Sequence, residues 1–201
     1  RRDSFFTGFS EGVIGSDRII KMLNVVEDKL VVEAKGIYSI EKFLVARRLM
    51  YWQVYLHKTV LAAEKLLVNT LKRAKYLSDQ GEHLFATPAL QFFLQNHGDF
   101  KSHKKVQETY TVLDLFSQLD DYDIMASIKV WAHHKDFVLS YLSRCMIDRK
   151  LYKIVIQKDS IDAGFVSEIQ EKVRTKYHLN DDDLSYFVFQ GNTSNSAYSA
   201  Q

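Results

Sequence analysis

The sequence has very little proline, glycine or cysteine. One proline and eight glycines among 201 residues are few for the many turns of a β-sandwich or β-barrel, so we expect a mainly helical protein. Cys145 is the only cysteine and has no partner for an internal disulfide, which fits the reducing cytoplasm. We therefore expect a cytoplasmic protein in which Cys145 serves as a small buried apolar residue.

Long hydrophobic runs and a strong net charge are also missing. No stretch approaches the roughly 20 apolar residues of a membrane-spanning helix, and no secretory signal sequence heads the chain. We therefore expect no membrane partner. The formal net charge is +2, but residues 1–80 hold 14 Lys and Arg against 9 Asp and Glu, a net +5. This excess suits an anionic ligand such as a phosphate; a nucleic-acid partner is left open but not indicated.

Helical patterns dominate residues 1–150. We predict a short helix at 18–23 and a β-hairpin at 25–32 around Glu27-Asp28. Residues 37–77 contain no glycine or proline, and this length predicts two helices, or one helix with a kink near His57. Further helices are predicted at 88–94, 106–117, 122–132 and 136–147, with a loop at 96–99.

The pattern changes after Lys150. Residues 151–156 and 186–189 are rich in β-formers and flank an amphipathic helix predicted at 161–177. The tail after Gly191 is polar, and we expect it to be flexible. The sequence thus predicts a mainly α fold with a small β-hairpin near the N-terminus, organised as a helical part over 1–150 and a small α/β subdomain over 151–201.

Self-contained catalytic motifs are absent from the sequence. It has no glycine-rich phosphate loop, no cysteine pair, no HExxH and no GxSxG. His133 and His134 are adjacent, so on a helix their side chains point about 100° apart and do not chelate one ion well. The acidic clusters at 120–123 and 181–183 are better explained as turns and helix caps than as cation sites.

Arg47, Tyr51 and Tyr55 form the strongest local pattern. Their spacing of four residues places them on one helical face, about 6 Å apart along the axis. A guanidinium binds phosphate oxygens, and tyrosines offer hydroxyls and flat rings for a sugar or base. Spacing alone favours an ordinary amphipathic helix whose tyrosines pack on a neighbour and whose arginine forms an ion pair.

A family resemblance reverses that preference. Its motifs are the Arg2-Asp3 pair, YSIEKF at 38–43, RRLMYWQVYLHKT at 47–59, LDD at 119–121, IKVW at 128–131 and RKL at 149–151. Together they resemble the HD-domain nucleotide phosphohydrolases, and within that family the bacterial relatives of the animal dNTP triphosphohydrolase. The resemblance covers nearly the whole chain and weakens beyond residue 157.

The resemblance implies a metal-dependent enzyme. Members of that family bind a divalent ion (Mn, Mg, Fe or Zn) through a histidine, a His-Asp pair and a later aspartate, which activates water against a phosphate ester. All four ligands are expected to precede Arg1. The chain is thus expected to be the C-terminal helical part of an HD-domain protein that converts a dNTP into nucleoside and triphosphate. By itself it is expected to be inactive, with neither a metal ligand nor a catalytic residue.

The same resemblance assigns substrate-binding residues. Asp3 matches an aspartate that accepts a hydrogen bond from the sugar 3′-hydroxyl, and Arg47 matches an arginine that binds the triphosphate. Tyr55 matches a tyrosine that packs on the deoxyribose, where its ring excludes a 2′-hydroxyl. Tyr51 is also expected to face the substrate, although the animal enzyme has histidine there. Leu56 replaces a glutamine that contacts the base, so the sequence predicts no base preference.

His57 and Lys58 resemble a pair near the effector-nucleotide surface of the animal enzyme, so we expect an effector or phosphate contact there. Because related proteins are oligomeric, a homo-oligomer is expected. Two alternatives stay open. In the first, the enzyme class is kept but the substrate is another phosphate ester or an alarmone. In the second, the chain is a non-catalytic oligomerisation or nucleotide-binding module.

Overall fold

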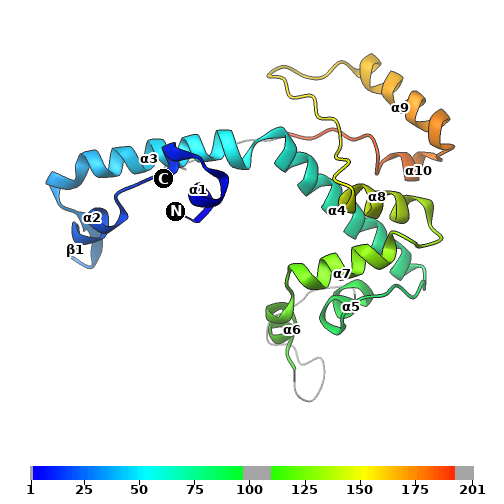
Figure 1. The fold of residues 1–201 in the computed structure, drawn as a ribbon, viewed down its shortest axis with the longest axis horizontal. Coiled ribbons are helices and arrows are strands. Elements are labelled where there is room, and N and C mark those ends of the chain that lie inside the picture. The colour runs from blue at the N-terminus through cyan, green and yellow to red at the C-terminus, as the bar shows by residue number, and fades with distance from the viewer. Residues whose placement is uncertain (1, 97–109, 193–201) are drawn as a thin grey trace. The chain divides into compact units, whose positions relative to one another are not determined.

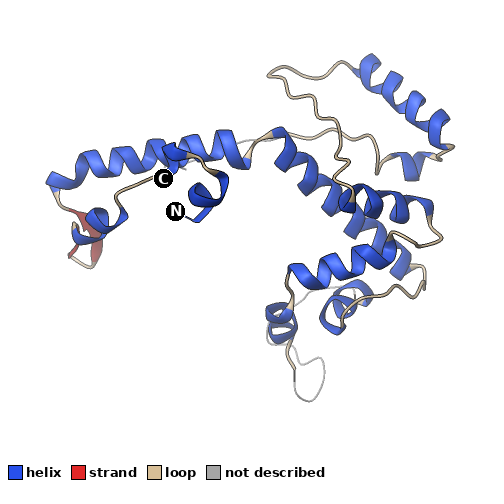
Figure 2. Cartoon of the chain, viewed as in Figure 1, coloured by secondary structure: helices blue, strands red, loops and turns tan. Residues whose placement is uncertain are grey.

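The computed structural model describes residues 2–96 and 110–192. Within these ranges the chain is mainly helical and has one two-stranded antiparallel sheet near the N-terminus, as predicted (Figures 1 and 2). The structure divides into two compact units. Among the described residues, the first consists of 2–61 together with 191–192, and the second of 62–190. None of the described helices is long and apolar enough to cross a membrane.

The first unit combines short helices with the hairpin. Its elements are α1 (Arg2–Thr7), a 3₁₀ turn (Ser10–Gly12), α2 (Ser16–Lys21), β1 (Leu23–Val26), β2 (Lys29–Val32), a second 3₁₀ turn (Ala34–Gly36), α3 (Ile37–Met50), a π-helical turn (Tyr51–Tyr55) and the start of α4 (Lys58–Asp79). Figure 2 shows the two strands in red between α2 and α3.

The hairpin prediction is confirmed. β1 and β2 pair from Leu23 opposite Val32 to Val26 opposite Lys29. Glu27 and Asp28 form the connection with φ of 51° and 60°, and this left-handed pair is the two-residue turn whose twist matches that of the strands. The preceding helix ends at Lys21, so Leu23, predicted as its last residue, begins the first strand instead.

The break predicted near His57 is also confirmed. α3 ends at Met50, and the chain then widens into the π-helical turn, where the Leu56 amide donates to the Tyr51 carbonyl at 2.8 Å. Nδ1 of His57 accepts from the Thr59 amide at 3.2 Å and so occupies a free donor at the start of α4. The segment is therefore two helices separated by a wider turn.

The second unit is built on α4. Its other elements are α5 (Pro88–Gln95), α6 (Val112–Gln118), α7 (Asp121–Trp131), α8 (Phe137–Ile147), α9 (Ala163–Tyr177) and α10 (Asp181–Leu184). The helices predicted at 88–94, 122–132 and 136–147 are confirmed within one or two residues. The helix predicted at 106–117 begins only at Val112, since residues 110–111 are not helical and Thr111 is its N-cap. Residues 106–109, most of the loop predicted at 96–99 and the tail from residue 193 lie outside the described residues.

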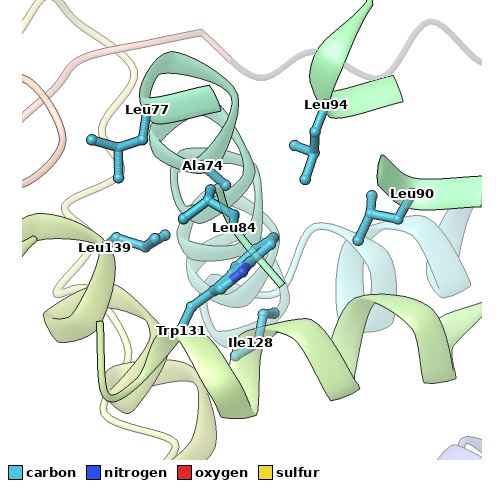
Figure 3. Packing of buried hydrophobic residues seen from close by; sticks show 8 residues of the cluster. All are labelled: Ala74, Leu77, Leu84, Leu90, Leu94, Ile128, Trp131 and Leu139. Carbon is cyan, nitrogen blue, oxygen red and sulfur yellow. The ribbon is translucent and has the colours of Figure 1, made fainter. Parts of the chain in front are cut away.

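The main core of this unit surrounds Trp131. Figure 3 shows eight buried side chains that meet between α4, α5, α7 and α8: Ala74, Leu77, Leu84, Leu90, Leu94, Ile128, Trp131 and Leu139. The indole of Trp131 is 1% exposed and donates to the Phe85 carbonyl at 2.9 Å, so its polar edge is satisfied. A second cluster joins Leu66 to α8 and includes Cys145, which is buried as predicted.

The acidic clusters serve as helix starts, as expected. Asp120 is the N-cap of α7 and accepts from the Tyr122 and Asp123 amides, while Asp123 accepts in return from the Asp120 amide at 2.8 Å. At α10 the cap is Asn180. Asp183, inside its first turn, accepts instead from Arg73 at 2.7 Å.

The strands predicted at 151–156 and 186–189 are wrong. Neither segment forms a strand in the described part of 151–192. Leu151, Tyr152, Tyr186 and Phe187 pack as side chains on the second cluster, and the hydroxyl of Tyr152 donates to the Tyr186 carbonyl at 2.7 Å. These four side chains thus pack on a core although the backbones do not pair, whereas Val155, Ile156 and Phe189 are exposed. Residues 151–190 share a compact unit with α4–α8; a domain boundary at residue 150 stays a prediction.

Candidate functional site

Asp3 and Tyr55 meet in the first unit although 52 residues separate them. The hydroxyl of Tyr55 donates to Oδ2 of Asp3, and Nε of Arg2 contacts Oδ1 at 3.3 Å. The hydrogen bond from Tyr55, followed by that from Arg2, holds the pKa of the Asp3 carboxyl below its ordinary value, and the same bond raises the pKa of Tyr55. Asp3 is therefore an ionised acceptor with both oxygens oriented.

Tyr51 links this pair to Arg47. The rings of Tyr51 and Tyr55 lie 5.2 Å apart in an edge-on arrangement with an interplanar angle of 63°. The guanidinium carbon of Arg47 lies 5.6 Å from the centre of the Tyr51 ring, within cation–π range. The four residues thus form a continuous row, with a carboxylate at one end and a guanidinium at the other.

In the part of the chain that the structure describes, Arg47 does not form the ion pair that an ordinary amphipathic helix would lead one to expect. It is exposed in the last turn of α3, and among residues 2–96 and 110–192 no carboxylate forms an ion pair with it. The tyrosines pack on each other. The row therefore keeps an accessible cation with five donors for an anionic group.

The 3₁₀ turn at Ser10–Gly12 packs against both α1 and α3. Ser4 is buried and its hydroxyl donates to the Phe9 carbonyl at 2.6 Å. A Cβ on Gly12 would lie 2.6 Å from Sδ of Met50 and 3.0 Å from Cβ of Ser4. Only glycine fits there without displacing a neighbour, so Gly12 and Met50 set where Asp3 can stand.

His57 and Lys58 follow directly after this row but make no described contact with it. His57 accepts from the start of α4, and Lys58 is exposed as the first residue of that helix. A cavity of about 380 Å³ lies beside α1 and is lined by Ser4, Phe5 and the loop through Ile14. Its lining does not include Arg47, Tyr51 or Tyr55, of which Arg47 and Tyr55 are exposed and Tyr51 is half-buried.

Metal ligands do not gather in the described residues. Within 2–96 and 110–192, no three His, Cys, Asp or Glu side chains are placed to hold one ion. Among the residues that the structure describes, the polar partners of the Asp3 carboxylate are Tyr55 and Arg2, and a hydroxyl donor and a cation do not make a cation site. The row is suited to binding an anion and a hydroxyl.

Two features of the site carry no clear sequence signal. Gly12 is one of eight glycines, and nothing local distinguishes it from the others. The π-helical turn adds one residue to the helical repeat at Tyr51–Tyr55, and such turns are frequent at functional sites. Its signal in the sequence is limited to the weak helical pattern before His57.

Comparison with known proteins identifies one matching family model and several similar proteins. Residues 14–84 match the family described as "HD associated region", a range that includes Arg47, Tyr51 and Tyr55 and begins after Asp3. The uncharacterized protein YwfO of Bacillus subtilis is 31% identical over 155 residues, which cover 77% of this chain and 33% of the relative. An uncharacterized protein of Mycoplasma pneumoniae is 28% identical over 207 residues, which cover 95% of this chain and 44% of that protein.

Among solved structures, the fold is similar to that of a phosphohydrolase from Bacteroides thetaiotaomicron. The TM-score is 0.82 at 50% sequence identity, over 92% of this chain and 45% of that protein. The chain therefore spans between a third and less than half of the length of these relatives. Residues 14–84 match the HD associated region, and the chain as a whole is similar in sequence and fold to a phosphohydrolase.

Proposed function

We propose that this chain is part of a metal-dependent phosphohydrolase that acts on nucleotides and converts a dNTP into nucleoside and triphosphate. The row from Asp3 through Tyr55 and Tyr51 to Arg47 carries the proposal. The carboxylate of Asp3 at one end suits a sugar hydroxyl, and the guanidinium of Arg47 at the other end suits a phosphate, so the row matches the two ends of a nucleotide. The similarity to a phosphohydrolase supports the hydrolytic class, and the nucleotide substrate rests on the row.

Each member of the row receives one role. Asp3 accepts from the sugar 3′-hydroxyl, because its ionised carboxylate retains acceptor capacity beyond the bonds from Tyr55 and Arg2. Tyr55 packs its ring on the deoxyribose, and Arg47 binds phosphate oxygens through its fork of N–H donors. Tyr51 holds the guanidinium over its ring and faces the phosphates. His57 and Lys58, two and three residues after Tyr55, are proposed as an effector or phosphate contact.

The divalent ion of the proposed reaction is assigned to the longer parent protein. The described residues contain no group of side chains that fits such an ion, so no chemical step is assigned to this chain. Its part is to bind and orient the nucleotide. We also propose that the parent is a cytoplasmic homo-oligomer.

Arg47→Ala in the full-length protein tests the proposal. The substitution removes the donor fork from an exposed position, so the fold is kept while kcat/KM for dNTP falls by roughly 100-fold or more, the scale of a lost charged contact to phosphate. Release of nucleoside and triphosphate is measured by chromatography with Mn²⁺ or Mg²⁺ present. Arg48→Ala is the matched control, since Arg48 is also exposed on the same helix but points about 100° away. Full activity of the Arg47 variant contradicts the assignment.

A substrate panel on the same full-length protein separates the alternatives. Hydrolysis of dNTPs above ribonucleotides, alarmones and simple phosphate esters is the expected result, because the Tyr55 ring is proposed to exclude a 2′-hydroxyl. Preference for another ester keeps the enzyme class and changes the substrate. Nucleotide binding or assembly without hydrolysis of any compound indicates the non-catalytic module.

A further inference from the structure

The β-hairpin is exposed on both faces. No residue of β1 or β2 is buried, and one face carries four aliphatic side chains: Leu30 is 71% exposed, Val25 63%, and Leu23 and Val32 38% each. A two-stranded hairpin is marginal by itself, and three or more strands with an apolar face are needed for stability. Both edges of this sheet are unpaired in the described chain, so it lacks the neighbours that such a sheet normally has.

The hydrogen-bond pattern shows which backbone groups are free. The Glu33 amide donates to the Met22 carbonyl at 3.0 Å, so that pair is a hydrogen-bonded one. Bonded and non-bonded pairs alternate along an antiparallel ladder. The pairs 23/32 and 25/30 are therefore the non-bonded ones, and the N–H and C=O groups of Leu30 and Val32 point away from β1 to the outer edge of β2.

We propose that this outer edge of β2 pairs with the same edge of a second copy of the protein, forming a four-stranded antiparallel sheet across a two-fold axis at Val31. In this register Leu30 faces Val32 of the other copy. These are the two residues with outward backbone groups, so both can exchange hydrogen bonds across the axis. The apolar face of one hairpin then continues into that of the other.

Charge complementarity selects the second copy and this register. With Val31 on the axis, Lys29 lies opposite Glu33 of the other copy, and the reverse pair forms on the other side. In the described part of the chain, Lys29 has no ion pair, and the Glu33 carboxylate forms one with the exposed Lys35 at 2.5 Å. Across the proposed interface, positions 29 and 33 form a pair without backbone hydrogen bonds, so their side chains lie close together and opposite charges there stabilise strand pairing. A shift of two residues in either direction breaks both charge pairs.

Proline substitution in the full-length protein tests the edge directly. Proline at Val32 removes an outward N–H that has no partner within the hairpin and leaves the β1–β2 ladder intact. We expect the mass of the Val32→Pro variant, measured by sedimentation equilibrium, to fall to half that of the parent. Val25→Pro is the control, because the Val25 N–H points to the opposite edge, where it donates to Oδ1 of Asn24 at 2.8 Å, and this variant should keep the parent's mass. A monomeric parent, or equal effects of the two prolines, overturns the proposal.

A charge exchange keeps the test independent of proline and of folding. Lys29→Glu or Glu33→Lys alone places like charges opposite each other at both ends of the interface. We expect the dissociation constant of the dimer to rise roughly tenfold for each single variant. The double variant Lys29→Glu with Glu33→Lys restores both pairs and should recover the parent's value. Failure of this recovery counts against the register. The inference rests on the proposed homo-oligomer and names its interface. Because these experiments measure mass and affinity of association, their outcome is independent of the nucleotide assays.

Discussion

The hydrogen bond between Tyr55 and Asp3 joins the two ends of the first unit. A hydroxyl donates more strongly to a carboxylate than to a neutral acid, so the bond stabilises ionised Asp3 and lowers its pKa below the ordinary value of 3.8. A depressed pKa of the folded state means that this contribution is present above the unfolded pKa and is lost as the pH falls through the folded one. Acidification should therefore loosen α1 from the π-helical turn first.

Tyr55→Phe isolates this bond. The ring stays in place while the donor is lost, so the pKa of Asp3 should rise toward its ordinary value. An NMR titration of the Asp3 carboxyl measures the change. Tyr51→Phe serves as the control, because the structure gives the Tyr51 hydroxyl no hydrogen bond to Asp3. An unchanged midpoint in the Tyr55 variant would show that Arg2 alone sets the pKa.

At the scale of elements, the sequence predicted those whose signals are local. Apolar strands around a Glu27-Asp28 turn gave the hairpin, and Asp120 marked the start of α7. The prediction failed where the structure of a segment depends on which other segments it contacts. Residues 151–156 have strand-forming side chains, but a strand also needs a backbone beside it. Here Leu151 and Tyr152 pack on the second cluster instead, and Val155 and Ile156 are exposed.

The candidate site shows the same division. Spacing placed Arg47, Tyr51 and Tyr55 on one face, and the ring and cation contacts agree with that. Periodicity gave no means of bringing Asp3 to Tyr55, because a contact between distant segments depends on tertiary packing; that expectation came from the family resemblance. The widening of the helix at Tyr51–Tyr55 was not predicted, since a π-helical turn uses the same residue types as an α-helix.

The tight packing of the Ser10–Gly12 turn against α1 and α3 predicts a sensitive glycine. In Gly12→Ala the new methyl group collides with Sδ of Met50 and Cβ of Ser4, so α1 should move outward and carry Asp3 away from Tyr55. We expect kcat/KM of the full-length enzyme to fall at least tenfold with helical content unchanged. Gly15→Ala is the control, since its nearest neighbour is Cβ of Arg18 at 4.0 Å. Equal activity of the two variants would mean that α1 does not position the site.

At the scale of the whole molecule, the two units differ in how much apolar surface they bury. In the described part of the first unit the buried hydrophobic residues are Met22, Ala46 and Met50. The second unit has two hydrophobic clusters and a buried arginine, Arg73, that pairs with Asp136 at 2.6 Å and with Asp183 at 2.7 Å. Hydrophobic burial dominates stability, so the second unit should be the more stable one.

Urea unfolding of the 201-residue chain can resolve this difference, because the two tryptophans report differently. Trp131 is 1% exposed in the core of the second unit, whereas Trp52 in the first is 60% exposed and should change little on unfolding. We expect the loss of helical circular dichroism to begin at lower urea than the fluorescence change, since the first unit unfolds before Trp131 is released. Trp52→Phe should leave the fluorescence midpoint unchanged. Coincident transitions by both probes would instead mean that the two units unfold as one.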